Sequence, residues 1–356
     1  MKFVDSYATH QLLPPYLSTD SEVQVFLFRL EKAIIAKYCD NQFNIGNARH
    51  RKYFYAPMES AQFGAIIVTK FPNLCSQDPV EVRKYTQYGN EFDHLSVTQI
   101  NVMVPIYRYK LSDHNIVCDG EVVWYEALIV TDSPTWQISN YEILGNRSLW
   151  GEMKFVREEP FGDFHFWVDI LMWRVFDPKS EQKILPFLLI DTGPGIPAAE
   201  VFADAKSAGM DGADTIEFVD QLKASLPGIS DIIEGRQEGG LNTVCLKQFR
   251  DARHASKAIY QALVGATAHY TNVSDLRFFN PAHAAVTFYS GAMVDQILGR
   301  FMGLTITNAE PDDHTGGTHT TPSRIGLPVP VSVGVAFSFK ADVRFDNYET
   351  LHQFPV

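Results

Sequence analysis

The sequence contains few cysteines, no excess of basic residues and no long apolar segment. Its four cysteines, Cys39, Cys75, Cys118 and Cys245, are far apart and form no C-x-x-C pair, which favours free thiols in a reducing compartment over a disulfide framework. The net charge of -12 argues against a nucleic-acid-binding surface, because such surfaces are usually basic. No apolar run is long enough to span a bilayer, and the N-terminus lacks the apolar core of a signal peptide. We therefore expect a cytoplasmic protein with no nucleic-acid or membrane partner.

The usual spacings of metal ligands are also missing. The segment His314–His319 (HTGGTH) contains two histidines but no nearby cysteine, and it fits no common zinc-ligand pattern. Its Gly and Thr content is typical of a mobile loop, such as a lid over a site. The sequence therefore predicts no metal site.

The first half of the chain predicts a mostly antiparallel β core. With 46% hydrophobic and 20% charged residues among 356, the chain can bury a sizeable core. The segment 21–37 has alternating apolar positions first and helical ones later, so its period does not separate a strand from a helix. Segments rich in Val, Ile, Phe, Tyr and Trp, separated by Asp, Asn, Gly and Pro clusters, predict strands at 61–69, 95–107, 121–130, 164–176 and 183–190.

The composition changes after the turn signal Asp191–Gly195 (DTGPG). Residues 198–208 and 214–226 have helical apolar spacing, and Pro227-Gly228 is a plausible stop. We interpret residues 194–240 as a helical insertion within a single domain that spans 1–356. The remaining predicted elements are strands at 241–248, 284–289 and 329–345, a helix at 252–264, and a further helix in the apolar run 293–298.

The segment Ser139–Phe155 (SNYEILGNRSLWGEMKF) contains a candidate nucleophile. Its single lysine, Lys154, follows two glycines and lies between Met153 and Phe155, close to Trp150. An apolar setting disfavours the charged form of an amine, and a neutral lysine attacks carbonyl groups. The pattern therefore favours a Schiff-base lysine. A surface lysine at the end of a strand is the alternative.

This segment resembles the motif N-D-x-x-I-x-x-G-R-E-x-x-G-x-P-K of the acetoacetate decarboxylase-like superfamily. The departures from the motif are Asn146 in place of Gly, Ser148 in place of Glu, and Met153 in place of Pro, and Phe155 replaces the second lysine of the decarboxylases. The stretches Leu12–Leu17 and Phe339–Phe354 resemble the family's first turn and closing strand, and Leu246–Gln248 is a weaker match. The motif itself is matched at Ser139-Asn140, Ile143, Asn146-Arg147, Trp150-Gly151 and Lys154.

The resemblance implies an α+β fold, with a mostly antiparallel β sheet or barrel around an apolar pocket, in a homo-oligomer. It implies that Lys154 forms an imine, which needs neither a metal nor an organic cofactor, and that Arg147 binds a substrate carboxylate. Glu349, in the closing strand, would be the general acid or base if burial raised its pKa. The alternatives are a structural arginine that ties loops together and a solvated carboxylate near the C-terminus.

Three further residues are expected at the substrate. Alignment on Val104-Pro105 places Gln99 where the decarboxylases have a glutamate that faces the substrate carboxylate. A neutral amide binds a carboxylate without repelling it, which favours aldol condensation, dehydration or cyclisation over decarboxylation. Glu126 lies in an apolar run, where a buried carboxylate is costly unless it is used or paired. Trp150 is expected to line the pocket. An ordinary polar strand residue is the alternative for Gln99.

Three functions remain open. The first is a lyase-type enzyme of secondary metabolism that forms a lysine imine with a keto acid or a related small carbonyl compound. The second is a non-covalent binding protein or cyclase-type scaffold for a larger apolar metabolite, in which Lys154 forms no bond. The third is an acetoacetate-type decarboxylase, which needs a carboxylate such as that of Glu126 close to Lys154.

Overall fold

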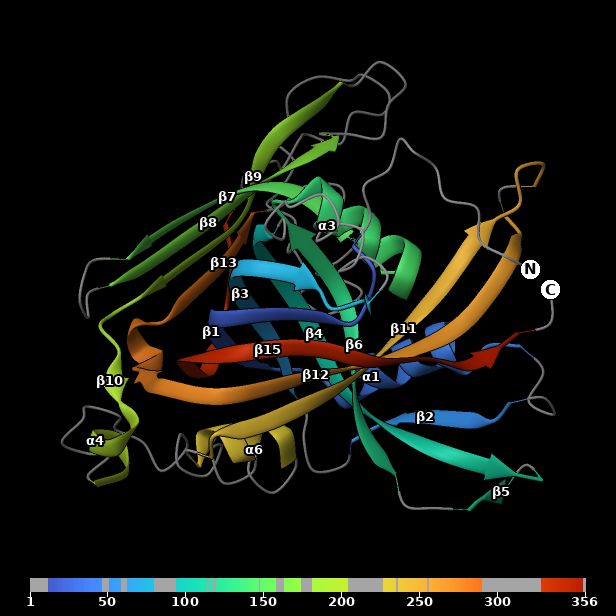
Figure 1. Ribbon diagram of the computed structural model, residues 1–356, viewed down its shortest axis with the longest axis horizontal. Helices are drawn as coiled ribbons and strands as arrows, with labels where there is room; N and C mark the ends of the chain where they lie inside the picture. The colour runs from blue at the N-terminus through green and yellow to red at the C-terminus, as the bar shows by residue number, and fades with distance from the viewer. Residues whose placement is uncertain are drawn as a thin grey trace, which may run out of the picture.

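Most of the described chain consists of β-strands in the computed structural model of the protein (Figure 1). None of the helices in the described ranges is both long and apolar enough to cross a membrane. The structure describes residues 12–46, 51–58, 63–79, 94–113, 115–117, 120–146, 148–157, 163–173, 181–203, 227–234, 236–254, 256–289 and 328–354.

Seven strands close into a barrel. They are β1 (Tyr16–Arg29), β3 (Phe63–Ser76), β4 (Leu95–Ser112), β6 (Glu121–Thr131), β11 (Glu238–Arg250), β12 (Ala258–Phe279) and β15 (Val333–Gln353). The order β6-β11-β12-β15-β1-β3-β4 returns to β6, because β4 also pairs with β6. Neighbouring barrel strands are antiparallel, except that β6 and β11 run parallel over two residue pairs. Each barrel strand therefore has a neighbour on both sides, although β11 meets β6 over only two residue pairs.

A second layer of strands continues from the barrel. It consists of β7 (Ser148–Arg157), β8 (Phe164–Trp173), β9 (Gln182–Thr192), β13 (Ala285–Tyr289) and β14 (Pro328–Val331). β7 joins this layer to β6 by a parallel pairing. The smaller elements are β2 (Tyr53–Pro57), β5 (Asn115–Ile116), β10 (Ile196–Pro197), α1 (Lys32–Tyr38), η1 (Cys39–Phe43), α4 (Ala198–Ala203) and η4 (Pro281–His283).

The barrel strands are apolar on both faces because both faces are covered. On β3, Ile67 packs into the barrel interior, whereas Ile66 and Val68 pack in a second core with Phe166 and Phe187 of the outer layer. Successive side chains of a strand point to opposite faces, so each barrel strand supplies two cores. This explains why the strands read as nearly continuous apolar runs.

Two helical segments cover the ends of the barrel. In Figure 1, α3 (Pro134–Ser139) lies above β12 and β15, and α6 (Pro227–Ile233) lies below them. The π-helical turn η3 (Asn140–Leu144) follows α3 directly in the chain. Trp136 of α3 and Ile233 of α6 both pack in the interior core. α6 lies so close to β11 that a Cβ at Gly228 would overlap the carbonyl oxygen of Gly240. Glycine is therefore required for this contact.

The predicted fold class is confirmed, since the described chain is α+β with a mostly antiparallel sheet closed into a barrel. The segment 21–37, whose period did not separate a strand from a helix, contains the end of β1 followed by α1. All five strands predicted before residue 191, and those predicted at 241–248, 284–289 and 329–345, overlap observed strands.

The helix predicted at 252–264 is wrong, because β12 begins at Ala258 and pairs on both sides, with β11 and with β15. These ladders override the local helical spacing. Within the predicted insertion 194–240, the structure describes β10, α4 and α6. The helical prediction at 214–226, the helix at 293–298 and the loop His314–His319 lie outside the described residues. The single-domain organisation remains a prediction.

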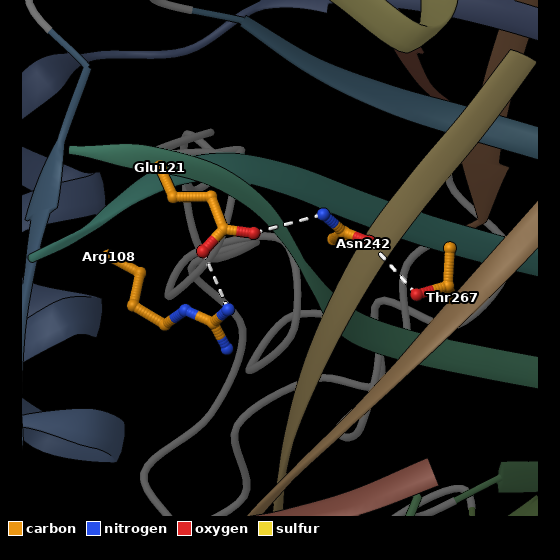
Figure 2. A network of polar contacts seen from close by, with 4 residues as sticks. All are labelled: Arg108, Glu121, Asn242 and Thr267. Atoms are coloured by element: carbon orange, nitrogen blue, oxygen red, sulfur yellow. Dashed lines mark hydrogen bonds and ion pairs between the residues drawn. The ribbon is translucent and has the colours of Figure 1, made fainter. Parts of the chain in front are cut away.

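Polar contacts fasten the short parallel pairing at the surface of the barrel. Figure 2 shows a chain of contacts across four neighbouring strands, from Arg108 through Glu121 and Asn242 to Thr267. The Arg108 guanidinium donates to Glu121 over 2.7 Å, the Asn242 amide donates to Glu121 over 3.0 Å, and the Thr267 hydroxyl donates to Asn242 over 2.9 Å. Asn242 therefore links β6 to β12 across β11.

We expect Asn242→Ala to lower the free energy of unfolding by about 1 kcal/mol, because two side-chain hydrogen bonds are lost at an exposed position. Urea denaturation measures this change. Asn115→Ala is the matched control, because its exposed amide donates only to the nearby Asp113 carbonyl, and it should leave the midpoint unchanged. Equal midpoints for the two variants would show that the network does not stabilise the barrel.

Candidate functional site

The barrel encloses a cavity of about 40 Å³ beneath α3 and η3. One water molecule needs roughly 10–15 Å³ measured in this way, so the cavity has room for a small molecule. Its described walls are mostly apolar and also include amide, carboxyl and hydroxyl side chains. The lining residues are Ile67, Thr69, Phe71, Gln99, Asn101, Met103, Glu126, Trp136, Asn140, Leu144, Leu241, Thr243, Ala266, Ala268, Tyr270, Val343, Phe345 and Tyr348.

Glu126 on β6 is the titratable carboxyl group in this lining. One carboxylate oxygen accepts a hydrogen bond from Asn101 over 2.8 Å, and the other accepts from Asn146 over 2.7 Å and from the Cys245 thiol over 3.2 Å. Burial raises the pKa of Glu126, and the three hydrogen bonds offset only part of that rise. A carboxyl whose pKa is raised in this way is suited to proton transfer.

A β-bulge in β6 directs Glu126 into the barrel. Met103 of β4 pairs with Glu126, but the adjacent Val102 pairs with Leu128, so Ala127 has no partner on β4. Without the bulge, residues 126 and 128 would face the same side of the strand. With it, Glu126 lines the cavity while Leu128 packs in the outer core. Bulges commonly re-aim a side chain next to a site.

Gln99 lines the cavity and also holds the helical cover in place. Its amide oxygen accepts hydrogen bonds from the Trp136 indole and, over 3.4 Å, from Asn140. Its amide nitrogen donates to Asn101 over 2.6 Å, and Asn101 in turn donates to Glu126. A continuous polar network therefore connects the cover with Glu126.

Lys247 of β11 fixes the end of the same cover. Its ammonium group donates to the carbonyl oxygens of Glu142 and, over 3.2 Å, of Ile143. These carbonyls belong to the last residues of η3, where a positive charge complements the end of a helix. Desolvation lowers the pKa of Lys247, and the nearby charge of Glu142 partly opposes this change. The weak sequence match Leu246–Gln248 therefore contains a residue that positions the cover.

Lys154 does not occupy the apolar setting that the sequence predicted. It is exposed on β7, whereas its neighbours Met153 and Phe155 pack against the outer core. The alternation along the strand explains the error, because two apolar neighbours that face a core turn the residue between them outward. Trp150 is only partly buried, and its indole donates to the Asp132 carbonyl over 3.2 Å. Neither side chain belongs to the described cavity lining.

Glu349 matches the alternative of a solvated carboxylate near the C-terminus. Glu349 is exposed on β15, and the adjacent Tyr348 lines the cavity instead. His352 is buried and packs edge-on against Phe354, with ring centroids 4.7 Å apart. Arg147 lies outside the described residues, so its predicted contact with a substrate carboxylate remains a prediction.

Sequence reasoning missed several residues of the site. Trp136, Asn101, Tyr270, Tyr348 and Cys245 surround the cavity or contact Glu126, but none of them belongs to the motif. Two signals could have located Asn101. It follows Gln99 at a spacing of two, which places both side chains on one face of the strand, and both are polar in an otherwise apolar run.

Within the described ranges, no group of three or more His, Cys, Asp or Glu side chains is arranged to hold a metal ion.

Comparisons with known proteins show the fold. The chain matches no protein-family model and no curated protein. An acetoacetate decarboxylase-like enzyme from Sphingomonas wittichii RW1 has a similar structure, with a TM-score of 0.50, 10% identity, and coverage of 98% of this chain and 100% of that one. The chain therefore has the acetoacetate decarboxylase-like fold.

Two other solved structures are less similar. Acetoacetate decarboxylase from Legionella pneumophila gives a TM-score of 0.48 at 9% identity, covering 99% of this chain and 92% of that one. The enduracididine biosynthesis enzyme MppR gives a TM-score of 0.45 at 12% identity, and the match covers 95% of this chain and 88% of that one.

Proposed function

We propose that this chain, which has the acetoacetate decarboxylase-like fold, is a lyase-type enzyme that acts on a small carbonyl compound inside the barrel. Glu126 is the group that transfers protons. The observation that carries the proposal is the position of Glu126, which a β-bulge turns into the cavity and three donors hold there. Its raised pKa supports the same role, because a general acid or base works best with a pKa near the operating pH.

A narrower form of the proposal is imine formation by Lys154 with a keto acid, with Arg147 and Gln99 binding the carboxylate and Glu349 moving protons. The exposed positions of Lys154 and Glu349 give this form less support than the position of Glu126 gives the broader one. Of the residues assigned to it, Gln99 lines the cavity. Aldol condensation, dehydration and cyclisation all need a proton acceptor beside the carbonyl compound, and Glu126 supplies one. We also propose that the active form is a homo-oligomer.

A second candidate function is non-covalent binding of an apolar compound. The observation that favours it is the mostly apolar lining, which includes Ile67, Phe71, Met103 and Leu241. Burial of an apolar ligand against these side chains is favourable by itself. Binding without turnover would distinguish this function from catalysis.

The proposed function is tested by NMR with a panel of small aldehydes, ketones and keto acids, supplied singly and in pairs. We expect at least one substrate to be consumed. We also expect Ala266→Leu, which adds a larger side chain to the cavity wall, to lower turnover by at least about 10-fold at a stability cost of about 1–3 kcal/mol. Ala285→Leu, at an exposed position of β13, is the matched control and should retain full activity.

Two results would contradict this proposal or refine it. Equal turnover by Ala266→Leu and the wild type would place the reaction outside the barrel cavity. Borohydride added to the same panel reports on imine formation. A reduced adduct on Lys154 that disappears in Lys154→Ala would establish the narrower mechanism, with the matched exposed variant Lys183→Ala as control.

A further inference from the structure

Tyr270 is a buried tyrosine in the lining of the cavity. It lies on β12 and is 6% exposed. Its ring packs edge-on against Phe339, with centroids 5.5 Å apart, and it forms part of the cavity lining. Within the described part of the chain, the Tyr270 hydroxyl makes no hydrogen bond. A buried tyrosine hydroxyl usually has a partner, so an unpaired one on a cavity wall points to a ligand.

Tyr270 lies in the wall of the same cavity as Glu126. They line one cavity from two barrel strands that are separated only by β11. Burial raises the pKa of Tyr270, and the negative charge of Glu126 raises it further. The phenol therefore stays protonated and can donate a hydrogen bond while the nearby carboxylate accepts a proton.

We propose that the cavity takes a small, uncharged, enolisable ketone or aldehyde, with Tyr270 donating to its carbonyl oxygen and Glu126 removing a hydrogen from the adjacent carbon. This inference rests on the proposed function and names its substrate class. The C–H bond breaks, and the proton passes to Glu126. The electron pair of that bond forms the C=C bond of an enolate, whose oxygen accepts the hydrogen bond from Tyr270. Tyr270 keeps its proton throughout, and return of a proton from Glu126 to carbon restores the ketone.

The cavity favours an uncharged compound over a carboxylate. A substrate anion would lie near the Glu126 carboxylate, and like charges repel strongly where water is excluded. In the enolisation, by contrast, the negative charge only moves from Glu126 to the enolate oxygen, so that no second charge is created. The apolar side chains of Ile67, Met103 and Leu241 suit the hydrocarbon part of such a compound.

Hydrogen exchange in D₂O tests this inference. Acetone, butanone and cyclopentanone are the uncharged probes, and pyruvate is the matched anion in which a carboxylate replaces one methyl group of acetone. We expect the protein to accelerate loss of the α-hydrogen NMR signal of at least one ketone, and to leave pyruvate at the buffer rate. Tyr270→Phe removes only the hydroxyl and should lower kcat for exchange by about 100-fold, as loss of a hydrogen bond to a developing oxyanion does.

The controls separate this inference from the proposed function. Tyr141→Phe, a matched change at an exposed position of η3, should exchange ketones at the wild-type rate, and thermal unfolding checks that Tyr270→Phe is folded.

Exchange of pyruvate but of no ketone would overturn the substrate class and leave the role of Glu126 intact. Ketone exchange that Glu126→Gln abolishes but Tyr270→Phe preserves would overturn the role of Tyr270. No exchange of any probe would overturn this inference, whereas failure of the wider substrate panel would overturn the proposed function.

Discussion

Glu126→Gln is expected to lower turnover of the accepted carbonyl substrate by at least about 100-fold, the usual contribution of a general acid or base. Glutamine has nearly the same shape and keeps one oxygen that accepts hydrogen bonds from the surrounding donors. It cannot take a proton from the substrate. The measurement is the initial rate under substrate saturation, which isolates kcat from binding.

The matched control for this change is Glu152→Gln, which removes an exposed carboxylate from β7. Its rate should equal that of the wild type. If Glu126→Gln kept the wild-type kcat, Glu126 would be a structural acceptor for Asn101, Asn146 and Cys245, and the proposed function would lose the observation on which it rests.

The same variant should change how stability depends on pH. Because burial raises the pKa of Glu126 above its ordinary value of 4.5, the folded protein binds this proton more tightly than the unfolded chain does. The resulting stabilisation is complete below pH 4.5 and is lost as the pH rises through the raised pKa. Urea denaturation at about pH 4.5 and about pH 7.5 should show the wild type losing more stability over this interval than Glu126→Gln. A parallel pH dependence of the two proteins would contradict the raised pKa.

Gly145→Ala is expected to lower the free energy of unfolding by about 3 kcal/mol or more. Gly145 ends η3 with φ of 76°, a left-handed conformation that disfavours any side chain. A Cβ at this position would also overlap the Cα of Lys247, so the cover could not stay against β11. Urea denaturation measures the loss, and reduced affinity for carbonyl ligands should accompany it, because Leu144 of the cover lines the cavity.

Gly46→Ala separates the strain of the left-handed backbone from the steric overlap with Lys247 as causes of the lost stability. Gly46 has a nearly identical φ of 75°, but a Cβ there would lie 3.3 Å from a ring carbon of Phe354, which a small side-chain movement relieves. We expect this control to cost only about 1–2 kcal/mol, the strain of the left-handed conformation. Equal losses at the two positions would show that the contact between Gly145 and Lys247 is not limiting.

Local patterns were enough to predict most of the strands. Alternating or continuous runs of Val, Ile, Phe and Tyr located β3, β4, β6 and β9, because such side chains fit a pleated surface that is covered on both faces. The same reasoning gave a wrong helix at the start of β12, where pairing with β11 and β15 outweighed the local period.

The face of the strand to which each side chain points was much harder to predict than the position of the strands. A shift of one residue moves a side chain to the opposite face of a strand. This explains why Lys154 and Glu349 are exposed while Met153 and Tyr348 pack or line the cavity. The sequence contained no signal for the bulge at Ala127, which depends on the register between β4 and β6.

The sequence by itself determined the mostly antiparallel β core, the resemblance to one superfamily and the presence of Gln99 and Glu126 in apolar strands. Burying a carboxyl group is costly, and that cost marked Glu126 as a residue to explain. Only the tertiary structure decided that Glu126 meets Asn146 and Cys245 inside a closed barrel. Those contacts join residues far apart in the chain, and such contacts form only when strand pairing closes the barrel. Local sequence patterns do not encode that closure.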